Sequence, residues 1–103
     1  MRYEWDERKN HENQRKHGGI SFPVATLAFD DPNCIIELDL VDDDGEQRWQ
    51  ALGSVSIRTG VGVVLLVIHC CREDEDGEEI IRIISARRAD QHDVRRYQEQ
   101  EVD

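Results

Sequence analysis

The feature that most constrains the fold is a nearly continuous apolar run, Val61–Cys71, with a turn signal on each side. Arg58-Thr59-Gly60 precede the run, and the acidic segment Arg72–Glu78, with Asp76-Gly77, follows it. An apolar run of strand length between turns is typical of a strand that is buried on both faces. It is shorter than the roughly 18 residues of a membrane span. The run therefore predicts the central strand of a sheet.

Three further runs have the character of strands: Cys34–Val41, Arg48–Ile57 and Ile80–Ala86. Apolar and polar side chains alternate along much of the first two runs, as in half-buried strands. Asp-Gly pairs between the runs, within residues 42–46 and 72–78, indicate tight hairpin turns. Strands joined by successive hairpins form an antiparallel meander. The sequence therefore predicts a four-strand antiparallel β-meander.

Three helices are predicted, and each begins at a side chain that favours the N-cap position: Asp6, Ser21 and Asp90. The first helix is polar and ends near His17, where glycines follow. The second is strongly apolar and should pack in the core. The third follows the last strand. We therefore expect a single α+β domain over residues 1–103, with the helices packed on one side of the sheet.

The charge of the chain is negative overall, at −10, but it is unevenly distributed. Residues 30–47 contain eight acidic side chains and no Lys or Arg, and residues 73–79 contain six more acids. Residues 82–96, by contrast, hold five arginines and two acids. The acidic segments are either solvated turns that maintain solubility or a surface for a basic partner, and both interpretations stay open.

The cysteines, Cys34, Cys70 and Cys71, are odd in number, and the last two are neighbours on a predicted strand. Neighbours on a strand point to opposite faces, so we interpret all three as reduced thiols. Without a Cys-x-x-Cys pair, and with scattered histidines, we predict no metal site and no cofactor. The polar first ten residues are unlike a signal peptide, so a cytoplasmic location without membrane contact is expected.

Arginines on and around the last two predicted strands are candidates for binding phosphate: Arg72, Arg82, Arg87 and Arg88. The guanidinium group matches phosphate geometry through two parallel donors, and it can stabilise the charge that develops on a reacting phosphate. The alternative is a set of surface ion pairs with nearby glutamates, which spacing alone favours. We further hypothesise that Arg72 and Arg87, at the two ends of the predicted hairpin, share one phosphate site.

A reaction at phosphate would also need a group that transfers protons, and the candidates are His69, His17, His92 and nearby glutamates. His69 precedes Arg72 by three positions on the same predicted strand, although a strand histidine is more often packed in the core. Trp49, at the start of the second strand, could stack on a nucleic-acid base, or it could belong to the core.

Several motifs together resemble the BrnT toxin family, and they occur in the expected order along nearly the whole chain. They are Tyr3-Glu4-Trp5-Asp6, Lys16-His17-Gly18, Gly45-Glu46-Gln47-Arg48-Trp49 and Arg82-Ile83-Ile84-Ser85-Ala86-Arg87-Arg88-Ala89. The resemblance implies a RelE-like fold and a metal-independent endoribonuclease that cleaves RNA and arrests translation. It also implies a BrnA-like ribbon-helix-helix antitoxin, through which alone the complex binds DNA.

The resemblance places the family's catalytic arginines on Arg72 and Arg87, and we add His69 as the candidate for proton transfer. We assign RNA binding to five further side chains: Arg82, Arg88, Trp49, Lys16 and His17. The alternative function is a non-catalytic interaction module that joins a DNA-binding partner and tunes its autorepression. The arginines favour the nuclease, and the acidic charge favours the interaction module.

Overall fold

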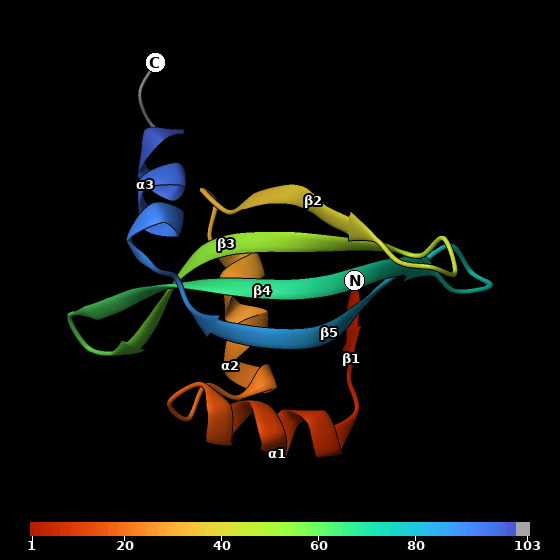
Figure 1. The fold of residues 1–103 in the computed structure, drawn as a ribbon, viewed down its shortest axis with the longest axis horizontal. Coiled ribbons are helices and arrows are strands. Elements are labelled where there is room, and N and C mark those ends of the chain that lie inside the picture. The colour runs from red at the N-terminus through yellow and green to blue at the C-terminus, as the bar shows by residue number, and fades with distance from the viewer. Residues whose placement is uncertain (101–103) are drawn as a thin grey trace.

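The computed structural model describes residues 1–100, which form a five-strand sheet with three α-helices and one short 3₁₀ helix (Figure 1). The strands are β1 (Arg2–Glu4), β2 (Ile35–Val41), β3 (Gln47–Arg58), β4 (Val61–Glu73) and β5 (Glu79–Arg88). The helices are α1 (Glu7–Lys16), α2 (Phe22–Thr26), the 3₁₀ helix η1 (Leu27–Asp30) and α3 (Gln91–Glu99). The strand order is β1-β5-β4-β3-β2, so the apolar run of β4 is the centre of the sheet, as predicted.

The prediction of a four-strand antiparallel sheet is incomplete, because the sheet is mixed. Strands β2 to β5 do pair antiparallel in sequence order. However, β1 adds a fifth strand at the edge, parallel to β5, with Tyr3 opposite Ile81. A strand of three residues shows no clear alternation of apolar and polar side chains. A short strand and an entry segment are both open interpretations of Tyr3–Trp5 from the sequence, and the pattern did not indicate that it pairs with β5.

The expectation that the helices lie on one side of the sheet is wrong. Helix α2 and η1 cover one face, and Figure 1 shows α2 crossing behind the central strands. Helix α3 covers part of the other face, where Tyr97 packs with Leu52 and Leu66. The physical reason lies in β4, where the neighbours Leu65 and Leu66 are both buried. Because neighbouring strand residues point to opposite faces, this stretch of β4 is covered on both sides.

Helix α1 is held in place by two buried asparagines rather than by an apolar stripe, one against the edge of β5 and the other against the start of α2. The Asn13 side chain donates to the carbonyl oxygens of Ala86 (2.7 Å) and Ile20 (2.9 Å), and it accepts from the Ala86 N–H (3.1 Å). The Asn10 side chain accepts from the Phe22 N–H at 2.9 Å. Asn13 thus provides hydrogen-bond partners for the backbone N–H and C=O groups of Ala86, a part of β5 that lies beyond the stretch paired with β1. These bonds fix α1 beside β5.

Helix η1 and β3 approach each other very closely at Gly53. A Cβ atom added to Gly53 would lie 2.2 Å from the carbonyl oxygen and 2.8 Å from the carbonyl carbon of Ala28. Ala28 is completely buried and belongs to the core beneath α2. The backbones of η1 and β3 can meet at this distance only because residue 53 has no side chain.

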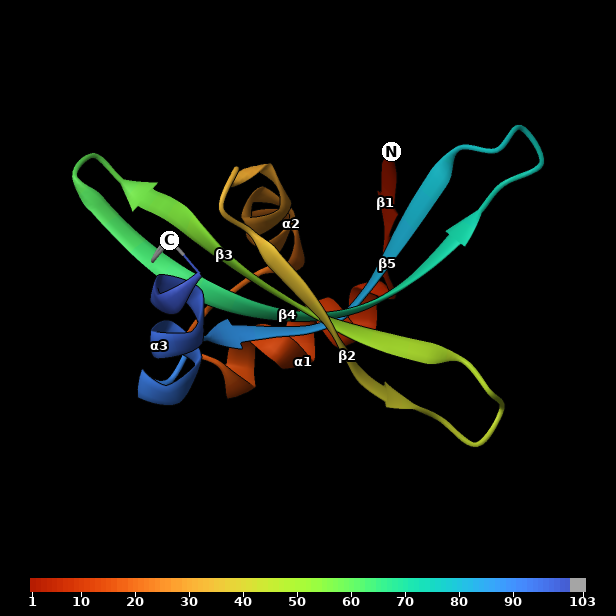
Figure 2. The same cartoon turned by 90° about the horizontal axis from the view of Figure 1, so that it is seen from above.

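Two hairpin turns of the same geometry, at residues 42–46 and 74–78, extend from one end of the sheet and diverge (Figure 2). In each, the first aspartate accepts two backbone N–H groups: Asp42 from residues 44 and 46, and Asp74 from residues 76 and 78. We call these two turns the acidic turns. Their position confirms the predicted hairpins. Among the described residues, no helix is long and apolar enough to cross a membrane.

Candidate functional site

Two arginines of β5 point to the sheet face that carries α3. Arg87 lies opposite Leu66, which packs against α3, and Arg82 lies opposite Cys70. Residues 66, 68 and 70 of β4 share one face because alternate strand residues point the same way. Arg82 and Arg87 therefore belong to the same face of the sheet, about five residues apart along β5.

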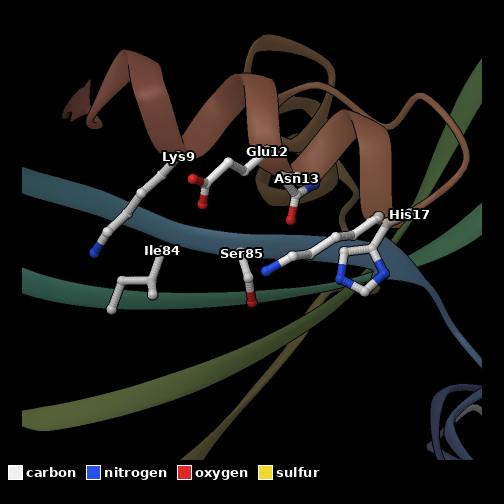
Figure 3. Close-up of a pocket in the computed structure, with 7 residues that line it drawn as sticks. Lys9, Glu12, Asn13, His17, Ile84 and Ser85 are labelled. Atoms are coloured by element: carbon white, nitrogen blue, oxygen red, sulfur yellow. The ribbon is translucent and has the colours of Figure 1, made fainter.

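Basic side chains of α1 reach over the same face of β5. Lys9, Lys16 and His17 line a hollow of about 200 Å³ together with Ile84 and Ser85 of β5. Figure 3 shows Lys9 of α1, and His17 at the C-terminal end of that helix, projecting across β5 on the side of these two residues. Ser85 lies opposite Ile68, which belongs to the apolar cluster on the α3 face. The end of α1 thus extends the face that carries Arg82 and Arg87.

His17 also lines a second hollow, of about 300 Å³, with Gly18, Arg87 and Arg88. The two hollows share His17, so four of the predicted residues come together here: Lys16, His17, Arg87 and Arg88. With Lys9 they form what we call the basic cluster. Four permanent positive charges gather in these two hollows, and Glu12 is the one acid lining them. The cluster is therefore a local cationic surface on an acidic protein.

A buried carboxylate orients Arg87 within the cluster. Nη1 of Arg87 lies 3.1 Å from Oδ2 of Asp93 and also donates to the carbonyl oxygen of Arg88 at 3.1 Å. Asp93 additionally accepts from Arg96 and closes a capping box with Asp90 at the start of α3. Burial alone would raise the pKa of Asp93, but hydrogen bonds from the Asp90 N–H, Arg87 and Arg96 together lower it. Asp93 therefore stays ionised and holds Arg87 in place.

Replacing Asp93 with Asn is expected to lower the free energy of unfolding at pH 7 by about 2 kcal/mol, because charge-assisted hydrogen bonds to two arginines are lost. A carboxylate whose pKa is lowered on folding stabilises the protein above its unfolded pKa of about 4. That contribution to stability disappears as the pH falls through the lowered pKa that Asp93 has in the folded protein. The difference between parent and D93N should therefore shrink in acid, which urea unfolding at several pH values will measure. An equal difference at every pH would contradict this role.

Arg72 and Arg82 line a separate cavity of about 280 Å³, near the other end of β5. Arg72 is bound by Glu4 through three contacts of 3.0 to 3.2 Å. Glu46 lines the same cavity, so the two arginines face two glutamates. The alternative of surface ion pairs thus holds for Arg72, although its partner is Glu4 rather than a glutamate of the adjoining turn.

The hypothesis that Arg72 and Arg87 share one phosphate site is wrong. Arg72 lies opposite Ile80, whereas Arg87 lies opposite Leu66. Arg72 and Leu66, the partner of Arg87, are six residues apart on β4. At the usual rise of a strand, this separates the two arginines by roughly 20 Å along the sheet. Arg72 is beside the hairpin turn, while Arg87 is at the far end of β5. The two ends of a hairpin are adjacent only at residues that flank its turn.

His69 and Trp49 lie opposite each other on β4 and β3, on the face that carries α2 and η1. The His69 side chain packs edge-on against Phe29, with ring centroids 4.9 Å apart, and only 1% of the residue is exposed. Burial lowers the pKa of His69, which keeps its ring neutral near pH 7. The structure therefore separates His69 and Trp49 from the arginines by the thickness of the sheet.

A wide groove, which we call the apolar groove, occupies the part of this second face that α2 leaves open. Its volume is about 540 Å³. Its lining residues come from the N-terminus, from the η1–β2 region and from four strands: Met1, Phe29, Asp31, Cys34, Ile36, Gln47, Trp49, His69, Cys71, Glu79 and Ile81. The molecule thus presents a cationic surface on one side of the sheet and an apolar surface on the other.

The three cysteines are free thiols, as expected: Cys70 is buried, Cys34 is half-buried and Cys71 is exposed. Burial raises the pKa of Cys34 to about 11. Burial and the neighbouring Glu46 raise the pKa of Cys70 to about 12. Both thiols therefore stay protonated near neutral pH and offer no thiolate nucleophile.

Sequence reasoning missed three contributors to the basic face: Lys9, Ser85 and the positioning residue Asn13. A signal for Lys9 was present, because residues seven apart, such as Lys9 and Lys16, lie on the same side of a helix. Ser85 stands next to Ile84, the extra residue of a bulge in β5, and no sequence pattern predicted that bulge. Asn13 belongs to the motifs that resemble the BrnT family, but its positioning role follows only from its contacts with the backbone of β5.

The fold and the two contrasting faces define a small α+β domain with one cationic surface and one exposed apolar surface. Residues 5–93 match the family model described as the ribonuclease toxin BrnT of type II toxin–antitoxin systems. Because this match spans most of the sequence, the chain belongs to the BrnT family, and the resemblance seen in its motifs is confirmed. Membership in a type II family implies an antitoxin partner. No curated protein matches the chain.

Proposed function

We propose that the chain is a metal-independent endoribonuclease that binds the scissile phosphate of RNA at the basic cluster. The observation that carries the proposal is the convergence of Lys9, Lys16, Arg87 and Arg88 around His17. These residues come from both ends of a chain with a net charge of −10. A local excess of cations is what phosphate binding requires, whatever the net charge of the rest of the molecule.

Within this cluster, Arg87 and Arg88 stabilise the charge that develops on the phosphate. His17 transfers the proton, because its imidazole ring borders both hollows beside the proposed position of the phosphate. We prefer His17 to His69, because the ring of His69 is buried on the opposite face of the sheet. Arg72 and Arg82 lie farther along the face of Arg87, but Glu4 and Glu46 share their cavity, so we assign no contact with RNA to them.

The neutralising partner in this proposal is a BrnA-like ribbon-helix-helix antitoxin that supplies all contacts with DNA. RNA cleavage by the free toxin in the cytoplasm then arrests translation, as for a RelE-like nuclease. The family match supports this proposal through the ribonuclease and the type II system that it names. The acidic turns support it as well, because they repel free nucleic acid at one end of the molecule.

Purified chain is expected to cleave single-stranded RNA in the presence of excess EDTA at the rate seen without it, because the proposed groups act without a metal. Cleavage products separated on a denaturing gel provide the measurement. Addition of the antitoxin should stop the reaction. Loss of cleavage in EDTA, restored by a divalent cation, would contradict metal independence. Tight antitoxin binding without any cleavage would instead identify the chain as the non-catalytic interaction module.

A further inference from the structure

The apolar groove leaves large hydrophobic side chains in contact with solvent. Met1 and Ile36, which line it, are 65% and 52% exposed. Leu38 is 48% exposed and lies opposite Trp49, so it points to the same side of the sheet. Both Ile36 and Leu38 belong to β2, the last strand of the sheet. An exposed apolar surface that continues to a sheet edge is characteristic of a binding surface for another chain.

The charge around the groove selects the kind of partner. Asp31 and Glu79 line the groove, none of its lining residues is Lys or Arg, and the Met1 ammonium is paired with Glu78 at 3.6 Å. Gln47 and Glu79, which also line it, adjoin the acidic turns at residues 42–46 and 74–78. This arrangement repels phosphate and so excludes RNA as the occupant. It attracts a protein segment that carries positive charges beside apolar side chains.

A buried polar atom in the wall of the groove adds to this argument. Nε2 of His69 is buried and has no hydrogen-bond partner among the described residues. An unpaired buried polar atom is unfavourable, and an occupant that displaced the wall enough to pair with it would remove that disadvantage. The groove therefore offers apolar contacts and an acidic rim, with one unpaired nitrogen buried in its wall.

We propose that a segment of the antitoxin with large apolar side chains flanked by Lys or Arg docks in the apolar groove. This inference rests on the proposed function, because that function supplies the antitoxin. It adds that the antitoxin is anchored on the face of the sheet opposite the basic cluster. RNA binding and antitoxin anchoring then use different side chains and can be changed separately by mutation.

The test uses the chain of residues 1–103 and, as the probe, a ribbon-helix-helix protein encoded by a gene next to its own, where such a gene is found. Ile36→Glu is expected to weaken the affinity at least tenfold, because it removes an apolar anchor and adds a negative charge to the acidic rim. Ile57→Glu is the matched control, since Ile57 is 43% exposed but does not line the groove. It should leave the affinity unchanged. Isothermal titration calorimetry measures Kd for each chain.

Two further measurements separate this inference from the proposed function. The I36E variant should cleave RNA at the parental rate when the antitoxin is absent, and Arg88→Gln should bind the antitoxin with parental affinity. Unchanged antitoxin affinity in I36E would overturn the groove assignment even if the chain cleaves RNA. A change confined to self-association of the chain, seen by light scattering, would assign the groove to a second copy and overturn the inference as well. An inactive parent would refute the nuclease alone.

Discussion

The double substitution Lys16→Gln and Arg88→Gln is expected to lower the rate of RNA cleavage about a hundredfold, which corresponds to about 2.7 kcal/mol of transition-state stabilisation. Both side chains are exposed, so folding should be unchanged. The two charges lie in the basic cluster, beside the proposed position of the phosphate. Their removal should also reduce the slope of log affinity against log salt by about 1.4 for single-stranded RNA.

The matched control removes two charges from elsewhere on the surface. Arg8→Gln and Arg58→Gln together change the net charge by the same amount, and both side chains are exposed and line neither hollow of the cluster. This control should retain most of the cleavage rate and most of the salt dependence. An equal loss in the control would show that only overall charge matters. Retained cleavage in the K16Q/R88Q variant would place the active site elsewhere.

Gly53→Ala is expected to lower the free energy of unfolding by about 3 kcal/mol or more, the upper end of the range for overpacked cores. The new methyl group would meet the Ala28 backbone at 2.2 Å. Neither backbone can move without disturbing the core between η1 and β3. The cause is purely steric, because Gly53 does not have a positive φ angle. Urea unfolding followed by circular dichroism will measure the change.

Gly62→Ala is the corresponding control in the neighbouring strand. A Cβ atom at Gly62 meets nothing closer than Oγ of Ser54, at 3.5 Å, which is ordinary contact. Stability should therefore change by less than about 0.5 kcal/mol. If G53A were as stable as G62A, the close approach of η1 to β3 described above would be incorrect.

Local sequence signals predicted the elements of the fold well. Asp6, Ser21 and Asp90 are the N-caps of the three α-helices, and Asp90 forms a complete capping box with Asp93. The hairpin turns were equally clear, because an Asp-Gly pair supplies the positive φ angle that the turn requires. These features depend on neighbours in sequence, so the sequence alone was sufficient to predict them.

The arrangement of the candidate site depended on contacts that no local pattern encodes. The separation of Arg72 from Arg87 follows from the register of β4 and β5. The position of α3 follows from the need to cover Leu66 on the face opposite α2. Lys16, His17, Arg87 and Arg88 were chosen individually from the sequence, but their meeting depends on the contact between Asn13 and Ala86.

That contact joins residues 73 positions apart in the chain. A growing polypeptide cannot bring Lys16 beside Arg88 until β5 has been synthesised and has paired with β4. Contacts of such long sequence separation also form late and slowly in folding. In a cell, a partly synthesised copy therefore lacks the assembled cationic surface. The harmful activity proposed for the toxin therefore cannot begin before β5 has been synthesised and has paired with β4.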